Sequence, residues 1–222
     1  MNVPGLAESP PGLRSPVEAI LIPVKRLSES KLRLAGVLGP PQRRRLALSM
    51  FADVLGAAAG WPLRLVVTSD RDAATMARSA GWSIVPDPGS GLNDAVAEGT
   101  SATSSAGATA LLVLPFDVPL VTGRELEALF ATEADVVVVR SDDGGTSGLL
   151  RRPPGAIAAR FGPESARSHA GAAGMAGLRV QTLRLPGLSL DVDDPGDLRR
   201  LAASGLDRAS VKVARELLAA AS

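Results

Sequence analysis

Cysteine is absent from this chain of 222 residues, and histidine occurs once, at His169. Without cysteine, neither a disulfide framework nor a thiolate-bound metal can form. A single imidazole also rules out a site built from several histidines. Any metal that this protein holds must therefore bind to oxygen, which favours magnesium, manganese or calcium over zinc.

Clustered positive charge and long apolar runs are also missing. The 24 Lys and Arg residues balance 23 Asp and Glu, and no segment is strongly basic, which argues against nucleic acid as the main partner. No apolar stretch is long enough to span a bilayer, and residues 1–16, rich in Pro, Gly and Ser, lack the pattern of a signal peptide. We expect a flexible N-terminus, one domain at 17–222, and a cytoplasmic protein without a membrane partner.

Aromatic residues make up only 3% of the chain, so its core must be built mainly from Ala, Val and Leu. Short apolar runs alternate with segments of helical periodicity. The predicted strands are 17–24, 63–68, 83–86, 108–114 and 135–140, and the predicted helices are 43–59, 70–80, 91–103 and 122–132. Four strand–helix units in series predict an α/β fold with a doubly wound, mostly parallel sheet.

The pattern is less regular after residue 141. Residues 144–150 are rich in glycine and lead into a short apolar piece, and 152–163 shows no clear period. A helix is predicted at 165–174, followed by an exposed-edge or antiparallel strand at 179–185. Two terminal helices are predicted at 195–203 and 210–221.

A carboxylate directly follows the most hydrophobic of these strands. Asp117 stands just after 108–114, and ligands of an open parallel sheet bind beyond the carboxyl ends of its strands. A buried, unpaired carboxylate is costly, and a bound cation would offset that cost. Considered alone, Asp117 fits a metal ligand and a turn former ahead of Pro119 equally well.

A second acidic group contains Asp191 and Asp193, which point to the same side of an extended backbone. Two carboxylates this close repel each other unless a proton or a cation lies between them. Asp194 and Asp197 have another explanation, because they flank a proline in the layout of a helix cap. Asp117, Asp191 and Asp193 together predict an oxygen-only site for Mg²⁺ and chemistry on a phosphate ester.

A cluster of cations follows the first predicted strand. Lys25, Arg26, Lys31 and Arg33 lie there, in a chain that has only three lysines. Compact ammonium groups suit a triphosphate, although a solvated surface loop is the alternative interpretation. The segment lacks the glycines of a Walker loop or of a dinucleotide-binding fingerprint.

The motifs of the chain, taken in order, resemble a known family. The sequence is similar to the guanylyltransferases of deazaflavin coenzyme F-420 biosynthesis, which act on 2-phospho-L-lactate or phosphoenolpyruvate. The matching segments span almost the whole chain after residue 18 and are 23–25, 30–35, 91–93, 117–119, 145–147, 160–165 with His169, and 191–195. Phe116 and Ser147 depart from the residues that are frequent at these positions.

The resemblance implies a nucleotidyltransferase fold, like that of nucleotide-diphospho-sugar transferases, and a reaction between GTP and a three-carbon phospho-acid. Each predicted role follows from the matching motif. Asp117, Asp191 and Asp193 are predicted to bind Mg²⁺; Thr146, Gly162 and Ser165 to bind the acid; Lys25, Lys31 and Arg33 to bind the triphosphate; and Leu92 and Asn93, after Gly91, to bind the guanine.

The predicted chemistry needs no general base, because a phosphate monoester is largely ionised at neutral pH. Lys25, Lys31 and Asp117 are the predicted catalytic residues, and His169 is expected to support the site without reacting. Two alternatives stay open: a molybdopterin or sugar-phosphate nucleotidyltransferase, and an inactive nucleotide-binding regulator. Phosphoenolpyruvate is preferred over 2-phospho-L-lactate as the acid, and a homodimer is possible.

Overall fold

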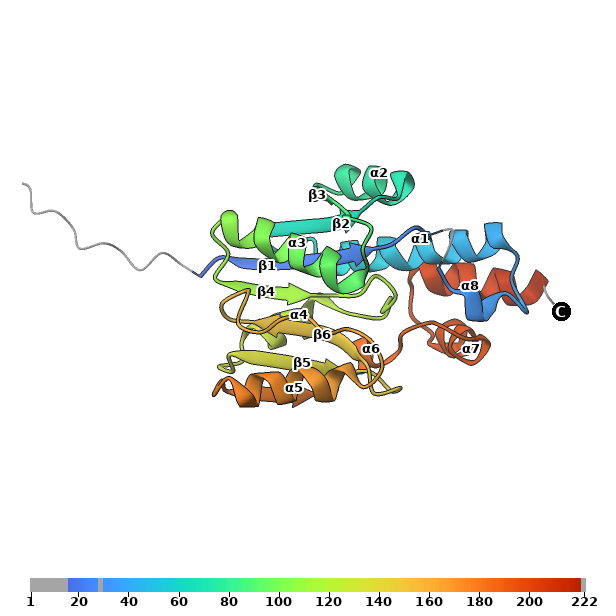
Figure 1. The fold of residues 1–222 in the computed structure, drawn as a ribbon. Helices are drawn as coiled ribbons and strands as arrows, with labels where there is room; N and C mark the ends of the chain where they lie inside the picture. Colours follow the sequence, from blue (N-terminus) through green and yellow to red (C-terminus); the bar gives the residue numbers. More distant parts are fainter. Residues whose placement is uncertain (1–15, 28–29, 221–222) are drawn as a thin grey trace, which may run out of the picture.

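A seven-stranded sheet organises the chain, with its strands in the order β3-β2-β1-β4-β6-β5-β7 (Figure 1). The computed structural model describes residues 16–27 and 30–220, so the predicted flexible N-terminus lies almost entirely outside the described residues. The strands are β1 (Glu18–Val24), β2 (Leu63–Thr68), β3 (Ser83–Pro86), β4 (Ala110–Val113), β5 (Val136–Arg140), β6 (Thr146–Arg151) and β7 (Val180–Leu183).

The prediction of a mostly parallel α/β sheet is confirmed. β1 pairs in parallel with both β2 and β4, and β2 pairs in parallel with β3. β6, which the sequence indicated only as a short apolar piece, is a full strand that runs antiparallel between β4 and β5. Of the two predictions for the segment 179–185, an exposed edge strand or an antiparallel strand, the first is confirmed. β7 lies at the edge of the sheet and pairs in parallel with β5.

The helices follow the predicted order with small shifts at their ends. α1 begins three residues before its predicted start, because two prolines fit the first turn of a helix, where no backbone N–H is needed. The short helix α6 had no counterpart in the prediction. The helices are α1 (Pro40–Ala57), α2 (Arg71–Ser79), α3 (Leu92–Ser105), α4 (Gly123–Phe130), α5 (Ser165–Met175), α6 (Pro186–Ser189), α7 (Pro195–Ala203) and α8 (Ala209–Ala220), and Leu32–Leu34 form a 3-10 turn, η2.

Helices cover both faces of the sheet. On one face, α1, α2, α4 and α6 share an apolar cluster with side chains of β1, β2, β4 and β5, and α2 lies over β2 and β3. On the other face, α3 and α5 pack on alternate residues of the same strands (Figure 1). The central strands are therefore buried on both sides, which explains their nearly continuous Ile, Leu and Val runs. None of the described helices is long and apolar enough to cross a membrane.

A third apolar cluster lies outside the sheet, where α8 packs against both α1 and α7. Leu46 and Met50 of α1 meet Val211 and Leu217 of α8 in this cluster. It also includes Leu34 of η2 and two residues ahead of α7, Leu190 and Val192. The loop after β1 and the loop before α7 therefore rest on one apolar support.

Two neighbouring strands, β1 and β4, mark the point where the chain order of the sheet reverses. β2 and β3 lie on one side of β1, and β4 lies on the other. The loops that leave the carboxyl ends of β1 and β4 separate here and leave a crevice between them. The lysines after β1 and Asp117 after β4 lie at this switch point.

Candidate active site

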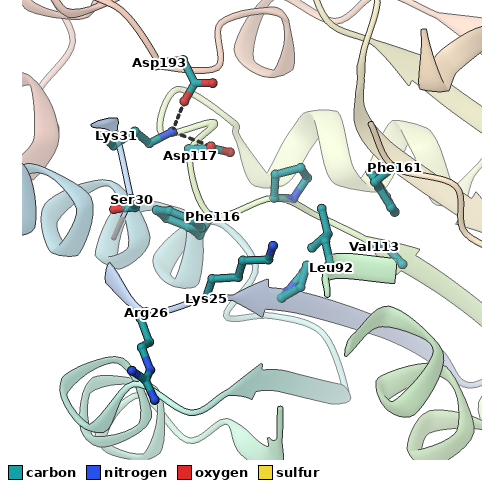
Figure 2. Close-up of a pocket in the computed structure, with 12 residues that line it drawn as sticks. Lys25, Arg26, Ser30, Lys31, Leu92, Val113, Phe116, Asp117, Phe161 and Asp193 are labelled. Atoms are coloured by element: carbon teal, nitrogen blue, oxygen red, sulfur yellow. Dashed lines mark hydrogen bonds and ion pairs between the residues drawn. The ribbon is translucent and has the colours of Figure 1, made fainter. Parts of the chain in front are cut away.

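A pocket of about 430 Å³ opens at the carboxyl ends of β1 and β4 (Figure 2). It collects side chains from segments that are far apart in the sequence. Its lining consists of Pro23, Lys25, Arg26, Ser30, Lys31, Leu92, Val113, Pro115, Phe116, Asp117, Phe161 and Asp193. Five of the predicted site residues are therefore on one surface: Lys25, Lys31, Leu92, Asp117 and Asp193.

The ammonium of Lys31 joins two of the predicted metal ligands. Its Nζ donates to Asp117 Oδ2 at 2.5 Å and to Asp193 Oδ1 at 2.7 Å (Figure 2). It also lies 5.4 Å from the centre of the Phe116 ring, within cation–π range. Phe116, one of the two residues that depart from the family pattern, therefore packs beside the ammonium of Lys31. Burial disfavours the charged form of Lys31, but the two carboxylates outweigh it and raise its pKa.

The backbone brings Asp191 and Asp193 beside Asp117. Val192 N donates to Asp117 O at 3.1 Å, which fastens the loop before α7 to the end of β4. Asp193 N donates to Asp197 Oδ2 at 3.1 Å, so the carboxylate in the first turn of α7 also fixes this loop. The predicted cap of α7 is confirmed, because the side chain of Asp194 accepts from the second and third backbone N–H groups of the helix.

Asp191 lies in a crowded acidic environment. Burial, followed by the charges of Asp117, Asp143 and Asp193, raises the pKa of Asp191 to about 7. Asp143 had no role in the sequence prediction, because it reads as a turn residue in a glycine-rich segment. Its Oδ1 does act as one, since it accepts from Ser141 Oγ at 2.5 Å and from Gly145 N at 2.9 Å.

These carboxylates suit a divalent cation by their chemistry. The described residues contain no ready-made cage of three or more metal-binding side chains, and Lys31 lies between Asp117 and Asp193 as a monovalent cation. Magnesium uses one or two carboxylates and completes its shell with water and substrate phosphates. An oxygen-only set with unrelieved repulsion at Asp191 therefore fits Mg²⁺ without a preformed cage.

The four predicted cations do not converge on one point. Lys25 extends into the pocket, whereas Arg26 points away from the Lys31 pair (Figure 2). Arg33 is exposed and outside the pocket lining. Its charge reaches Asp143, whose pKa is lowered mainly by the hydrogen bond from Ser141 and also by Arg33.

The predicted guanine residues, Leu92 and Asn93, begin α3 and have separate positions. Leu92 lines the pocket. The side-chain amide of Asn93 instead holds the backbone of Phe161: Phe161 N donates to Asn93 Oδ1 at 2.7 Å, and Asn93 Nδ2 donates to Phe161 O at 3.1 Å. Gly91, with a φ of 133°, lines an adjoining hollow together with Asp87.

The three predicted acid-binding residues surround the start of α5. Gly162 has a φ of 148°, and Ser165 opens α5. Thr146, at the start of β6, contacts α5 through His169: Thr146 Oγ1 lies 3.0 Å from His169 Nδ1. The N–H groups at a helix N-terminus favour an anion. The start of α5 therefore suits an anionic group, whereas the carboxylates around Asp117 suit a cation.

Sequence comparison identifies relatives along nearly the whole chain. Residues 18–220 match the model of the family described as "Guanylyl transferase CofC like". A phosphoenolpyruvate guanylyltransferase of Rubrobacter xylanophilus is 41% identical over 191 residues, which cover 83% of this chain and 93% of the relative. One of Chloroflexus aggregans is 38% identical over 195 residues, covering 83% and 96%.

Solved structures support the same fold at low sequence identity. A protein of Desulfovibrio desulfuricans described as a nucleotide-diphospho-sugar transferase superposes with a TM-score of 0.76 at 18% identity, covering 93% of this chain and 97% of the other. A 4-diphosphocytidyl-2C-methyl-D-erythritol synthase gives 0.60 at 15% identity, covering 85% and 97%. The predicted nucleotidyltransferase fold is confirmed, and the chain belongs to the family of CofC-like guanylyl transferases.

Proposed function

We propose that the protein transfers GMP from GTP to the phosphate of phosphoenolpyruvate and releases pyrophosphate, as a step of coenzyme F-420 biosynthesis. Relatives at 41% and 38% identity carry the name phosphoenolpyruvate guanylyltransferase. The observation that carries the proposal is the contact of Lys31 with Asp117 and Asp193 at the switch point of the sheet. It concentrates cationic and metal-binding groups where a nucleoside triphosphate is expected to bind.

The reaction forms one P–O bond and breaks another. A phosphate oxygen of the acid attacks the α-phosphorus of GTP, and the bond from that phosphorus to the bridging oxygen breaks, so the electron pair leaves with pyrophosphate. The attacking phosphate is already ionised near neutral pH, so no side chain has to remove a proton. The one histidine fits this picture, because it is buried and hydrogen-bonded through both ring nitrogens.

Mg²⁺ would be held by Asp117, Asp191 and Asp193, and when bound it would neutralise charge on the phosphates. The side chains of this protein supply the remaining positioning. Lys25 extends into the pocket and suits the triphosphate, while Lys31 neutralises charge beside Asp117. Catalysis would then depend on in-line positioning of the two reactants and on neutralisation of the charge that develops on the phosphates.

The acid would bind near the start of α5. Gly162 offers its backbone N–H there, Ser165 offers its side-chain hydroxyl, and the hydroxyl of Thr146 lies at the start of β6. An anionic carboxylate and phosphate suit these neutral donors. Because both reactants are anionic, Lys25 and Lys31 in the pocket would reduce the repulsion between them.

The proposal can be tested by product mass. Purified protein is incubated with GTP, Mg²⁺ and one of three acids: phosphoenolpyruvate, 2-phospho-L-lactate or 3-phosphoglycerate. We expect guanylylated product and pyrophosphate with phosphoenolpyruvate, and little with 3-phosphoglycerate. If product forms only with 2-phospho-L-lactate, that acid is the substrate instead of phosphoenolpyruvate. If product forms with none of the three, the proposed function is refuted.

Parallel incubations address the nucleotide and the alternative substrates. ATP, CTP and UTP replace GTP in one series, and a sugar 1-phosphate or molybdopterin replaces the acid in another. We expect transfer only from GTP and only to the three-carbon acid. Faster transfer to a sugar phosphate would favour a sugar-phosphate nucleotidyltransferase instead.

A further inference from the structure

His169 is fully buried in α5 and uses both nitrogens of its ring. The backbone N–H of Arg160 donates to His169 Nε2 at 2.8 Å, and Nδ1 lies 3.0 Å from Thr146 Oγ1. The ring edge packs on Phe161, with the ring centres 5.1 Å apart. One side chain therefore contacts β6 and also the segment 160–164 that leads into α5.

The partners of the ring determine its tautomer. A backbone N–H is only a donor, so the nitrogen that faces Arg160 must be an unprotonated acceptor. In a neutral imidazole the other nitrogen then carries the hydrogen. His169 is thus the Nδ1–H tautomer, and it donates to Thr146 Oγ1.

This direction of donation decides what Thr146 can offer. A hydroxyl that accepts from His169 keeps its own hydrogen for another partner, whereas a hydroxyl that donates to an imidazole has none left. Within the part of the chain that the structure describes, Thr146 Oγ1 forms a hydrogen bond only with His169. The hydroxyl hydrogen of Thr146 is therefore free to bind an anion.

The same histidine helps to fix the backbone beside the acid. Its Nε2 holds Arg160, and the amide of Asn93 holds the next residue, Phe161, through two further hydrogen bonds. Gly162, which follows them, has a backbone conformation that other residues rarely adopt. Three hydrogen bonds to two consecutive residues thus set the position of the Gly162 backbone.

We propose that His169 is a positioning residue of the acid-binding region, which turns the Thr146 hydroxyl into a hydrogen-bond donor for the substrate and anchors the segment that carries Gly162. The proposal rests on the proposed function, in which Thr146 and Gly162 bind the acid. It assigns His169 no proton transfer. It also gives Asn93, which was predicted to contact guanine, a different role: its amide holds the backbone of Phe161 beside the acid-binding Gly162.

The tautomer can be observed without any activity assay. His169 is the only histidine of the chain, so ¹⁵N-labelling of histidine gives the signals of one ring. We expect the Nδ1–H pattern, unchanged from pH 8 to 5, because burial and the charges of Arg151 and Arg160 lower the pKa of His169 to about 4. An Nε2–H pattern, or a charged ring at pH 7, would overturn the proposal.

Function is tested by a double-mutant cycle on His169 and Thr146. His169→Gln retains an acceptor for Arg160 but loses the donor to Thr146, and Thr146→Val removes the hydroxyl. The measured quantity is the Kd of phosphoenolpyruvate, by calorimetry with Mg²⁺ and α,β-methylene-GTP. Each single change is expected to weaken binding about tenfold, and His169→Gln in the Thr146→Val background less than threefold further, because the two residues act through one hydrogen bond.

Further variants separate positioning from a general role in folding. His169→Asn places an amide N–H near Nδ1 and is expected to regain part of the lost affinity. Ser168→Ala, at the exposed neighbouring position of α5, is the matched control and should bind as the wild type does. Equal losses from His169→Gln in both backgrounds would overturn the proposal.

The two proposals fail in different ways. If the wild-type protein makes no guanylylated product from any acid, the proposed function is refuted whatever tautomer is observed. If the wild-type protein is active but the effects of His169 and Thr146 add, the function stands and the positioning role is refuted.

Discussion

Lys31 shows how a single side chain sets the charge of the site. It is one of three lysines in a chain that otherwise uses arginine, and its backbone adopts a left-handed conformation with φ 58°. An ammonium is a compact charge that can lie between two carboxylates, whereas the planar guanidinium of arginine favours a fork-shaped contact with one. The lysine at this position is therefore explained by the geometry of Asp117 and Asp193.

Asp117 is the residue whose loss should affect activity most. Asp117→Asn keeps the shape of the side chain but removes a charge that the proposed Mg²⁺ would need. We expect a fall in kcat of about 100-fold or more, with unchanged far-ultraviolet circular dichroism. Asp207→Asn, at an exposed residue that pairs with Lys212, is the control. Normal turnover by Asp117→Asn would remove the metal proposal.

Lys31→Met tests the relation between the lysine and the metal. Without Lys31, Asp117 and Asp193 face each other with no cation between them, so we expect a loss of about 1 to 3 kcal/mol in the free energy of unfolding without Mg²⁺. Added Mg²⁺ should restore much of it, and the variant should gain more from Mg²⁺ than the wild type does. Thermal unfolding with and without Mg²⁺ measures this, with the exposed Lys212→Met as control. An equal response to Mg²⁺ in all three proteins would contradict the idea.

His169 should make stability depend on pH. Burial lowers its pKa to about 4 in the folded state, against about 6.5 in an unfolded chain. Between these values the unfolded state binds more protons, so the contribution of His169 is complete above pH 6.5 and is lost as the pH falls towards 4. Each pKa unit corresponds to about 1.4 kcal/mol.

Urea unfolding at pH 7, 6 and 5 measures this dependence. The wild type should lose stability more steeply than His169→Gln over this range, after correction for the lower stability of the variant at pH 7. Parallel curves for the two proteins would show that His169 is not the group responsible.

The candidate site was predictable from sequence only where local rules apply. The close approach of Asp191 and Asp193 follows from two-residue alternation, and Asp194 follows from its capping position. The contact of Lys31 with Asp117 and Asp193 spans 86 and 162 residues of chain, so no spacing could indicate it. Asn93 was assigned to guanine from its motif, but its amide is bonded to Phe161, a partner set by the packing of α3 beside the start of α5.

At the scale of single elements, α3 is held unusually close to the sheet. A Cβ at Gly99 would lie 2.5 Å from Leu21 Cδ1 and 2.8 Å from Val67 Cγ2. Gly99→Ala should therefore cost about 1 to 3 kcal/mol in the free energy of unfolding, although alanine is the better helix former. Gly171→Ala in α5, where nothing lies within 4 Å, should instead stabilise the protein by about 0.5 to 1 kcal/mol. Chemical denaturation measures both changes in the free energy of unfolding. If both variants were stabilised, or both destabilised, the result would contradict the close packing of α3.

The elements themselves were predicted best where one periodicity dominates. Strands β1, β2, β4 and β5 have buried apolar runs, and α4 begins close to its predicted start, where Thr122 and Glu125 form a capping box. β6 was missed because its sequence TSGLLR begins with small and polar residues, and burial on both faces removes the alternation. Its antiparallel direction depends on pairing with β4 and β5, which the segment itself does not encode.

At the scale of the whole molecule, the site combines parts from two ends of the chain. Leu34 follows the loop of Lys31, while Leu190 and Val192 flank Asp191, and all three belong to the cluster under α7 and α8. The C-terminal helices therefore do more than cover α1. They hold the lysine side and the aspartate side of the site against one common support.

α8 itself is fastened to α1 at its start. Asp53 of α1 accepts from Ala209 N at 3.1 Å, from Ser210 N at 2.8 Å and from Ser210 Oγ at 2.5 Å. This carboxylate satisfies backbone donors that the first turn of a helix leaves unpaired. The apolar cluster thus has a fixed position relative to the sheet that carries Asp117.

A pair of matched cavities tests this support. Val211 in α8 and Val136 in β5 are both fully buried, the first in the cluster under α7 and α8 and the second on the face covered by α3 and α5. Either valine-to-alanine change should cost about 2 kcal/mol of stability, from the lost methyl groups and the cavity. Only Val211→Ala should also lower kcat, by roughly tenfold, because small displacements of reacting groups are expensive.

Both variants are assayed well below their unfolding temperatures, so that lost stability alone does not reduce the folded fraction. An equal effect of the two changes on kcat would mean that the cluster supports only the fold. A selective effect of Val211→Ala would mean that the C-terminal helices help to align Lys31 with Asp193, since neither α7 nor α8 contributes a side chain to the pocket lining.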